Sequence, residues 1–195
     1  VTSIGIYAFE GTPLTSLSLP TTLSSIGSYS FANTRLSTLV IPEGVTEIGT
    51  NAFGQNPLTS ISLPSTLKSI GDSAFAGTQI TSIVIPEGVT SIGAGAFAGC
   101  PLSSITLPST LTSIGGSAFY STQLSNIDFP EGITTLDITG AFNGSPISSV
   151  TLPTTLSSIS SFAFQGSQLN SIVIPEGVTS IGIYAFEGTP LTSLS

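Results

Sequence analysis

Residues 85–102 read IPEGVTSIGAGAFAGCPL, and this stretch contains each element of a pattern that runs through the whole chain. Similar stretches recur about every 22 residues, so the chain divides into units that begin at Val1, Leu23, Val45, Leu67, Val89, Leu111, Ile133, Leu156 and Val178. Seven of the eight complete units have 22 residues, the unit from Ile133 has 23, and the ninth has 18. Such a period is typical of a protein whose units stack on one another.

Individual positions within the unit are fixed by residue type. Position 20 is Pro in all eight complete units, and position 9 is Phe in all nine, at Phe9, Phe31, Phe53, Phe75, Phe97, Phe119, Phe142, Phe164 and Phe186. The extra residue of the unit from Ile133 lies within residues 137–140. Odd units end in Pro-Ser/Thr-Thr and even units in Pro-Glu-Gly, so a deeper period of 44 residues is present.

The apolar pattern predicts two short extended segments and one turn in each unit. Positions 17 and 19 are apolar and alternate with polar positions 16 and 18, which is typical of a strand with one buried face. We expect positions 14–19 to form a continuous parallel sheet along the stack and positions 1–4 to form a second extended segment. Ala and Phe at positions 8 and 9 favour a short 3₁₀ or helical turn with the Phe inside.

The pattern of residues 85–102 resembles the BspA-like class of leucine-rich repeat, and the resemblance covers the whole chain. It implies a leucine-rich-repeat solenoid with a parallel β-sheet, and a surface-exposed or secreted protein, mostly bacterial but also known from protists, that acts in adhesion to host or matrix proteins. The units here are one residue shorter than is common in the family, and Thr or Ser stands where Cys is common. The family has no shared catalytic residues to carry over.

The two ends of the chain have the same sequence. Residues 1–18 and residues 178–195 both read VTSIGIYAFEGTPLTSLS, at a spacing of 177 residues. We expect residues 1–195 to form one continuous solenoid of eight complete repeats plus a partial ninth, excerpted from a longer tandem array with a 177-residue super-repeat. Engineering, with one end copied onto the other, is the other explanation.

The composition excludes several functions. With no His there is no Ser-His-Asp or Cys-His catalysis and no imidazole metal site, and a single Cys cannot form an internal disulfide. Two basic residues and a net charge of −8 disfavour binding to nucleic acid, and no apolar run is long enough to span a membrane. We therefore expect no enzyme, no cofactor and no metal.

Three groups of reactive side chains could form sites, and the first two are interpreted as structural. Cys100 occupies position 12, where other units mostly carry Thr or Ser, and we expect a small, partly buried residue there. Glu43, Glu87, Glu131 and Glu176 recur in every second unit, and we expect a solvated acidic row roughly 10 Å apart, too far for two of them to share a cation. Asp128, Glu131 and Asp137, with Asn126 close by, flank the insertion and are the place to look first for Ca²⁺ or a glycan.

Outward-facing positions 16 and 18 predict a long, nearly uncharged face of hydroxyls and small apolar groups. The candidate interaction face consists of Ser16, Thr38, Val40, Ser60, Ser62, Ser82, Val84, Ser104, Thr106, Asn126, Asp128, Ser149, Thr151, Ser171 and Val173. It suits a surface that binds proteins or glycans or self-associates, and an uncommitted solvent face is the other interpretation.

Two functions follow from these observations. The first is a non-catalytic extracellular structural or adhesive protein, a segment of a cell-surface fibre, with partners among host or matrix proteins, glycans, or copies of itself joined head-to-tail or as a covalent tandem continuation. The second is an ice-binding solenoid whose Ser and Thr ladders order water, although these ladders also contain Val and Asp.

Overall fold

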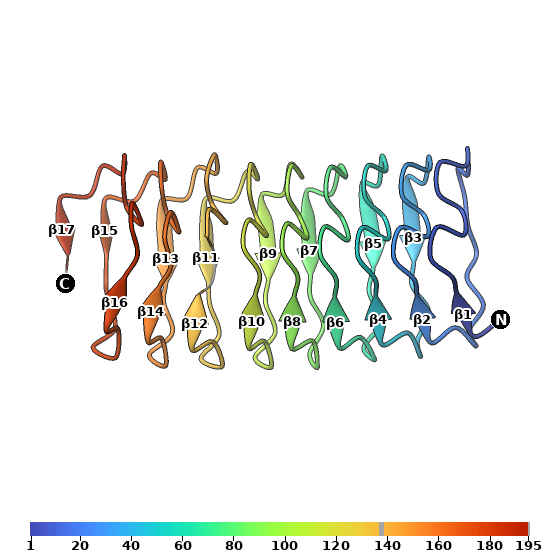
Figure 1. The fold of residues 1–195 in the computed structure, drawn as a ribbon, viewed down its shortest axis with the longest axis horizontal. Coiled ribbons are helices and arrows are strands. Elements are labelled where there is room, and N and C mark those ends of the chain that lie inside the picture. The colour runs from blue at the N-terminus through green and yellow to red at the C-terminus, as the bar shows by residue number, and fades with distance from the viewer. Residues whose placement is uncertain (137–138, 195) are drawn as a thin grey trace.

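The protein is a stack of nine coils, one for each sequence unit, in a computed structural model that describes residues 1–136 and 139–194 (Figure 1). We number the coils 1–9 in chain order and keep the position numbers of the sequence units. The N- and C-terminal coils lie at opposite ends of the stack, and two strips of short parallel strands run along it. The predicted solenoid with parallel strands is confirmed.

The strip formed by positions 3 and 4, called the 3–4 strip, contains the longer sheet. Its six-stranded part consists of β1 (Ser3–Ile4), β2 (Ser25–Ile26), β4 (Glu47–Ile48), β6 (Ser69–Ile70), β8 (Ser91–Ile92) and β10 (Ser113–Ile114). A three-stranded part follows, with β12 (Thr135–Leu136), β14 (Ser158–Ile159) and β16 (Ser180–Ile181). Neighbouring strands pair in register, as Ser3 with Ser25 and Ile4 with Ile26.

The second strip, called the 16–18 strip, is divided into pairs of strands, so the prediction of a continuous sheet there is wrong. The pairs are β3 (Thr38–Val40) with β5 (Ser60–Ser62), β7 (Ser82–Val84) with β9 (Ser104–Thr106), β11 (Asn126–Asp128) with β13 (Ser149–Thr151), and β15 (Ser171–Ile172) with β17 (Ser193–Leu194). Each pair joins an even coil to the odd coil that follows it (Figure 1). The pairing therefore has the 44-residue period of the sequence.

Proline at position 13 accounts for part of this alternation. From an even coil to the next odd coil, the N–H at position 19 donates to the carbonyl at position 18, as from Ile41 to Ser62 at 3.0 Å. Between an odd coil and the next even coil, the N–H at position 13 of the even coil donates back to the carbonyl at position 14 of the odd coil, as from Arg35 to Leu14 at 2.8 Å. Odd coils have Pro at position 13, which has no N–H, so this second bond forms in one direction only.

The turn predicted near positions 8 and 9 is present, but it is not helical in the described residues. Alternate N–H groups leave the coil: those of Tyr7 and Phe9 donate to the carbonyls of Ser28 and Ser30 in coil 2, at 3.0 and 2.8 Å. The N–H of Ala8 instead donates within the coil to Gly5, at 3.3 Å. Left-handed φ values at position 7, such as 61° at Tyr7, interrupt any helix.

Glycine at position 5 allows neighbouring coils to approach closely. A Cβ atom on Gly71 would lie 2.7 Å from the carbonyl carbon of Gly49, closer than a real Cβ contact. Position 5 is Asp137 in coil 7 and Ser160 in coil 8, and the break between the two parts of the 3–4 strip falls between coils 6 and 7. Across the same junction the strands of the 16–18 strip are paired, with Ile127 opposite Val150. Residues 137 and 138 themselves lie outside the described residues.

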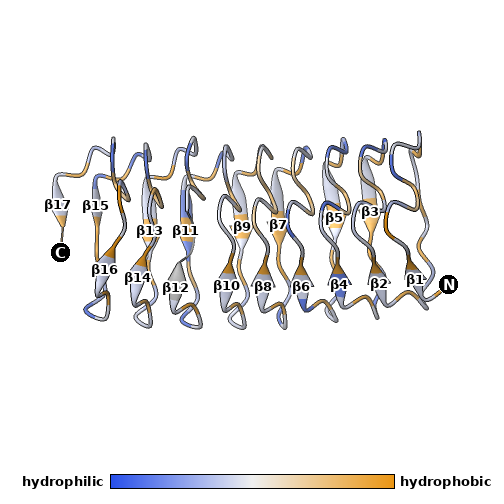
Figure 2. Ribbon diagram, viewed as in Figure 1, coloured by the Kyte–Doolittle hydropathy of each residue, from blue (hydrophilic) through white to orange (hydrophobic). Residues whose placement is uncertain are grey.

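The core is a column of stacked phenylalanine rings enclosed by aliphatic side chains. Neighbouring rings of position 9 have centroids 5.2–6.0 Å apart and are nearly parallel. Hydrophobic and neutral segments alternate along each coil, and most of the strongly hydrophilic stretches lie at turns (Figure 2). The sequence predicts that all nine rings are buried, and the seven inner rings are. The prediction is wrong for the two end rings: Phe9 is 39% exposed and Phe186 is half-buried, because no coil covers their outer side in the structure.

Candidate functional site: an open hydroxyl face and its supports

Every residue of the predicted interaction face is exposed in the structure. The face follows the 16–18 strip, because position 17 points into the core, as Leu39 does with 4% exposure, while positions 16 and 18 point outward on the same strand. Asp128 is its one ionisable residue among the fifteen. The face therefore offers hydroxyl donors and acceptors and methyl groups.

Exposed valines recur on this face with the 44-residue period. Val40, Val84 and Val173, at position 18 of even coils, are 68, 68 and 69% exposed. Asp128 occupies the same position in coil 6, where its Oδ1 accepts a hydrogen bond of 2.6 Å from the hydroxyl of Thr151. Because valine is usually buried, exposed copies in one row are the informative feature of the face.

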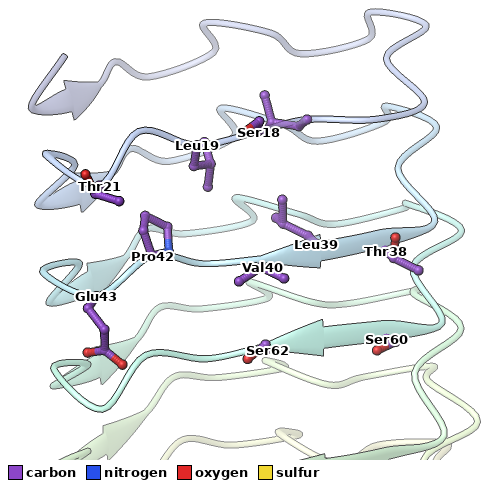
Figure 3. Close-up of a pocket in the computed structure, with 11 residues that line it drawn as sticks. Ser18, Leu19, Thr21, Thr38, Leu39, Val40, Pro42, Glu43, Ser60 and Ser62 are labelled. Atoms are coloured by element: carbon purple, nitrogen blue, oxygen red, sulfur yellow. The ribbon is translucent and has the colours of Figure 1, made fainter.

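The face is hollowed where coils meet. One hollow of about 790 Å³ spans coils 1–3 and is lined by residues that include Ser18, Thr38, Val40, Glu43 and Ser60. Figure 3 shows Thr38 beside Ser60 and Val40 beside Ser62 on the paired strands β3 and β5. A second hollow of about 460 Å³ spans coils 3–5 and includes Val84 and Thr106. These hollows suit contact with a surface or an extended chain.

The acidic row is exposed, as predicted, and three of its members, Glu43, Glu87 and Glu131, also link neighbouring coils. Glu43 accepts hydrogen bonds at Oε1 from the Ser65 N–H and at Oε2 from the Ser65 hydroxyl, both 3.0 Å. Glu87 accepts the same two bonds from Ser109, at 3.1 and 3.0 Å, and Glu131 accepts them from Thr154, at 2.8 and 2.7 Å. The two hydrogen bonds from Ser65 lower the pKa of the Glu43 carboxyl below its ordinary value of 4.5.

The threonine that follows adds further hydrogen bonds to these links. The Thr66 hydroxyl accepts the Gly44 N–H at 2.9 Å and donates to the Val45 carbonyl at 2.9 Å. The Pro-Glu-Gly end of an even coil and the Pro-Ser/Thr-Thr end of the next odd coil are thus chemically complementary. Their alternation explains the 44-residue period.

Cys100 belongs to a buried polar column at position 12. Its thiol donates to the Phe75 carbonyl at 3.1 Å and lies 3.2 Å from the Thr78 hydroxyl. Burial raises the pKa of the Cys100 thiol above its ordinary value, so the group is neutral and poorly nucleophilic at neutral pH. Cys100 is fully buried, which agrees with a structural role rather than a reactive one.

Asn56 is the best-connected member of that column. Its amide donates to the carbonyls of Phe31 at 2.7 Å and Phe53 at 3.1 Å, and its Oδ1 accepts the Thr34 hydroxyl at 2.5 Å and the Leu36 N–H at 3.2 Å. Sequence reasoning did not single out Asn56. The signal was available: it is the one Asn in a column otherwise made of Thr, Ser and Cys.

The acidic group beside the insertion has no metal-site geometry in the described residues. Asp128 contacts Thr151 and Glu131 contacts Thr154, so both carboxylates are engaged with neighbouring coils. Within residues 1–136 and 139–194, no three Asp, Glu or Cys side chains are grouped so that they could hold an ion. Asp137, the third member of the predicted group, lies outside the described residues.

The stack, the repeated apolar columns and the open strand face define a leucine-rich-repeat protein. The profile of the BspA type leucine-rich repeat region matches residues 1–102 and 68–193, and the chain belongs to this family. No curated protein sequence matches the chain. The part of the chain that the structure describes contains no helix long and apolar enough to cross a membrane.

Solved bacterial proteins have the same fold. A leucine-rich repeat protein from Bacteroides ovatus is 31% identical with a TM-score of 0.81, and the match covers 100% of this chain and 52% of that one. This chain therefore spans about half the length of that relative. A leucine rich cell surface protein from Faecalibacterium prausnitzii is 26% identical with a TM-score of 0.52, covering 100% and 69%. A leucine-rich repeat protein of T. pallidum, 23% identical with a TM-score of 0.53, covers 85% and 70% and shares the fold.

Proposed function

We propose that this chain is a non-catalytic segment of an extracellular, cell-surface repeat protein and that its open face binds proteins or glycans in adhesion. The observation that carries the proposal is the row of exposed valines among hydroxyls on the face. A relative named as a cell surface protein supports the location. A nearly uncharged face of this kind favours contact through methyl groups and hydroxyl hydrogen bonds, with little dependence on salt.

Binding to panels of extracellular matrix proteins and glycans tests this proposal. The face is disrupted in a Val40→Lys/Val84→Lys variant, which places two charges among the methyl groups. The matched control, Thr46→Lys/Thr90→Lys, adds the same charge at exposed position 2, where the chain already carries Lys68. We expect the control to bind like the unmodified chain and the valine variant to lose binding. Equal binding by both variants would overturn the assignment to this face.

An ice-binding function is the second candidate, because the face is rich in Ser and Thr and nearly free of charge. The division of the 16–18 strip into pairs of strands counts against it, since an ice lattice requires regular spacing. Thermal hysteresis of the unmodified chain separates the two candidates. A freezing-point gap that grows with concentration would favour ice binding.

Self-association is part of the proposed function. The equal sequences of residues 1–18 and 178–195 support continuation of the stack, either covalently in a longer array or between copies head-to-tail.

A further inference from the structure

The two hollows on the open face are built from the same positions of the sequence unit. The hollow of coils 3–5 is lined by Ile61 and Leu63 of an odd coil, by Val84 of the next even coil, and by Ser104 and Thr106 beyond it. The hollow of coils 1–3 is lined by the equivalent residues of the preceding period, Leu17, Leu19, Val40, Ser60 and Ser62 (Figure 3). The same hollow therefore recurs every two coils, which is roughly 10 Å along the stack.

The hollow of coils 3–5 lies over a gap in the 16–18 strip. Strands β5 and β7 belong to different pairs, so the ladder of strand hydrogen bonds is interrupted between coils 3 and 4. In the part of the chain that the structure describes, the N–H of Leu63 donates to no backbone carbonyl, whereas the equivalent N–H of Ile41 donates to Ser62 at 3.0 Å. The hollow therefore offers a backbone donor that the stack itself does not use.

The same gap leaves apolar side chains open to a ligand. Ile61 and Leu63 are half-buried, whereas their counterparts in the preceding even coil, Leu39 and Ile41, are buried. In coil 4, beyond the gap, Val84 is 68% exposed. Exposed hydroxyls of positions 16 and 18 surround these apolar groups. Each hollow thus combines an apolar wall, an N–H donor and a rim of hydroxyls.

An acetamide group matches this combination, because it has a carbonyl and a methyl side by side. Its carbonyl is an acceptor for the N–H of Leu63, and its methyl is a partner for Val84. The surrounding Ser and Thr hydroxyls suit the hydroxyls of a sugar ring. The face carries one carboxylate among its fifteen residues and the chain has a net charge of −8, so a neutral glycan suits it better than a polyanionic one.

The two-coil spacing favours one kind of acetamide-bearing glycan. In a β-1,4-linked chain of N-acetylglucosamine, each ring is rotated by half a turn relative to the ring before it, so acetamides on one side of the chain recur at every second ring. Two rings of this extended chain are close in length to two coils. A chain that lies along the stack therefore presents an acetamide to each hollow in turn.

We infer that the open face of coils 1–5 binds a neutral β-1,4-linked chain of N-acetylglucosamine, with one acetamide in each hollow. The inference rests on the proposed function of the open face and names its ligand. Val40 and Val84 mark the two acetamide positions. Asp128 takes the place of valine in coil 6, where its carboxylate accepts a hydrogen bond from Thr151, so the valine positions are interrupted there.

Isothermal titration calorimetry with chitobiose, chitotetraose and cellotetraose tests the inference. Cellotetraose is the matched control ligand, because it has the same linkage and length but a hydroxyl in place of each acetamide. We expect chitotetraose to bind at least about tenfold more tightly than chitobiose, because it fills both hollows at once. We expect cellotetraose to bind at least about tenfold more weakly than chitotetraose, because it leaves the N–H of Leu63 and the methyl groups of Val84 without their partners.

Two variants test the role of the repeated valines. Val84→Lys fills one hollow and leaves the other, so the affinity for chitotetraose should fall to about that for chitobiose, while the control Thr90→Lys, at exposed position 2, should leave it unchanged. Asp128→Val restores valine in coil 6, beside the unpaired strands β9 and β11. It should raise the affinity for chitohexaose and leave that for chitobiose nearly unchanged, a gain that misfolding cannot produce.

Three results would overturn the inference. Equal affinities for chitotetraose and cellotetraose would remove the acetamide, and equal affinities of Val84→Lys and Thr90→Lys for chitotetraose would remove the hollow. Absence of binding to all these sugars, with binding to a matrix protein that Val40→Lys/Val84→Lys abolishes, would remove the glycan and leave the proposed function standing. Loss of neither kind of binding in that double variant would remove both.

Discussion

Removal of one ring from the phenylalanine column should weaken the fold strongly. Phe53 is fully buried, and its centroid lies 5.5 Å from that of Phe31 and 5.7 Å from that of Phe75. Truncation of such a side chain to alanine costs about 3–5 kcal/mol, which combines the lost transfer of the ring from water with the cavity that remains. Because Phe31 and Phe75 are held by their own coils, the cavity cannot close easily, so we expect the upper part of this range.

Urea unfolding followed by circular dichroism measures the loss, and Phe9→Ala is the matched control. Phe9 is 39% exposed and has one ring neighbour in its column, so its truncation should cost about 1–2 kcal/mol. A loss below about 1 kcal/mol for Phe53→Ala would show that the ring is not enclosed and that the assigned register is wrong. Equal losses for the two variants would show that burial by neighbouring coils does not determine stability.

Three further predictions concern the polar links between coils. Because the pKa of Glu43 is lowered in the fold, the ionised carboxylate stabilises the folded state at pH values above its ordinary pKa of 4.5, and this stabilisation is lost as the pH falls through the pKa of the folded state. Thermal unfolding between pH 7 and 3 should show this loss as a falling melting temperature. Glu43→Gln should make the melting temperature depend less steeply on pH. Asn56→Leu removes the amide that donates to the carbonyl of Phe31, so urea unfolding should show a loss of about 2–4 kcal/mol in the free energy of unfolding. Asn56→Thr should lose less. A leucine variant with an unchanged free energy of unfolding would contradict the buried network. The Cys100 thiol should react with Ellman's reagent at pH 8 only after denaturation, and rapid labelling of the native chain would contradict its burial.

The positions that face the core and those that face outward were predictable from the sequence, because each is occupied by one kind of residue at a regular spacing. Phe at position 9 and the outward polar residues of positions 16 and 18 follow from apolar periodicity, which is local to a unit. The same reasoning placed all fifteen residues of the open face on the surface. It could not show which function that face serves, because hydroxyl and methyl groups are shared by many binding surfaces.

The links between coils were not predictable in the same way. The partner of Glu43 is Ser65, 22 residues away, and the bond depends on how two turns of different sequence meet. The 44-residue alternation was visible in the sequence, but its consequence for the 16–18 strip depends on backbone hydrogen bonds around Pro13 and its equivalents. The helical turn was wrong because alternate N–H groups at positions 7 and 9 bond to the next coil, which a pattern within one unit does not reveal.

Pairing of coils in twos underlies the links between coils and the row of exposed valines, and amide hydrogen exchange by NMR tests this pairing most directly. At position 19, the N–H groups of Ile41 and Ile85, in even coils, donate to the next coil at 3.0 Å. Among the described residues, the N–H groups of Leu63 and Leu107, at the same position in odd coils, donate to no backbone carbonyl. We predict slow exchange at Ile41 and Ile85 and fast exchange at Leu63 and Leu107. Equal protection at all four amides would contradict the pairing and show a uniform stack.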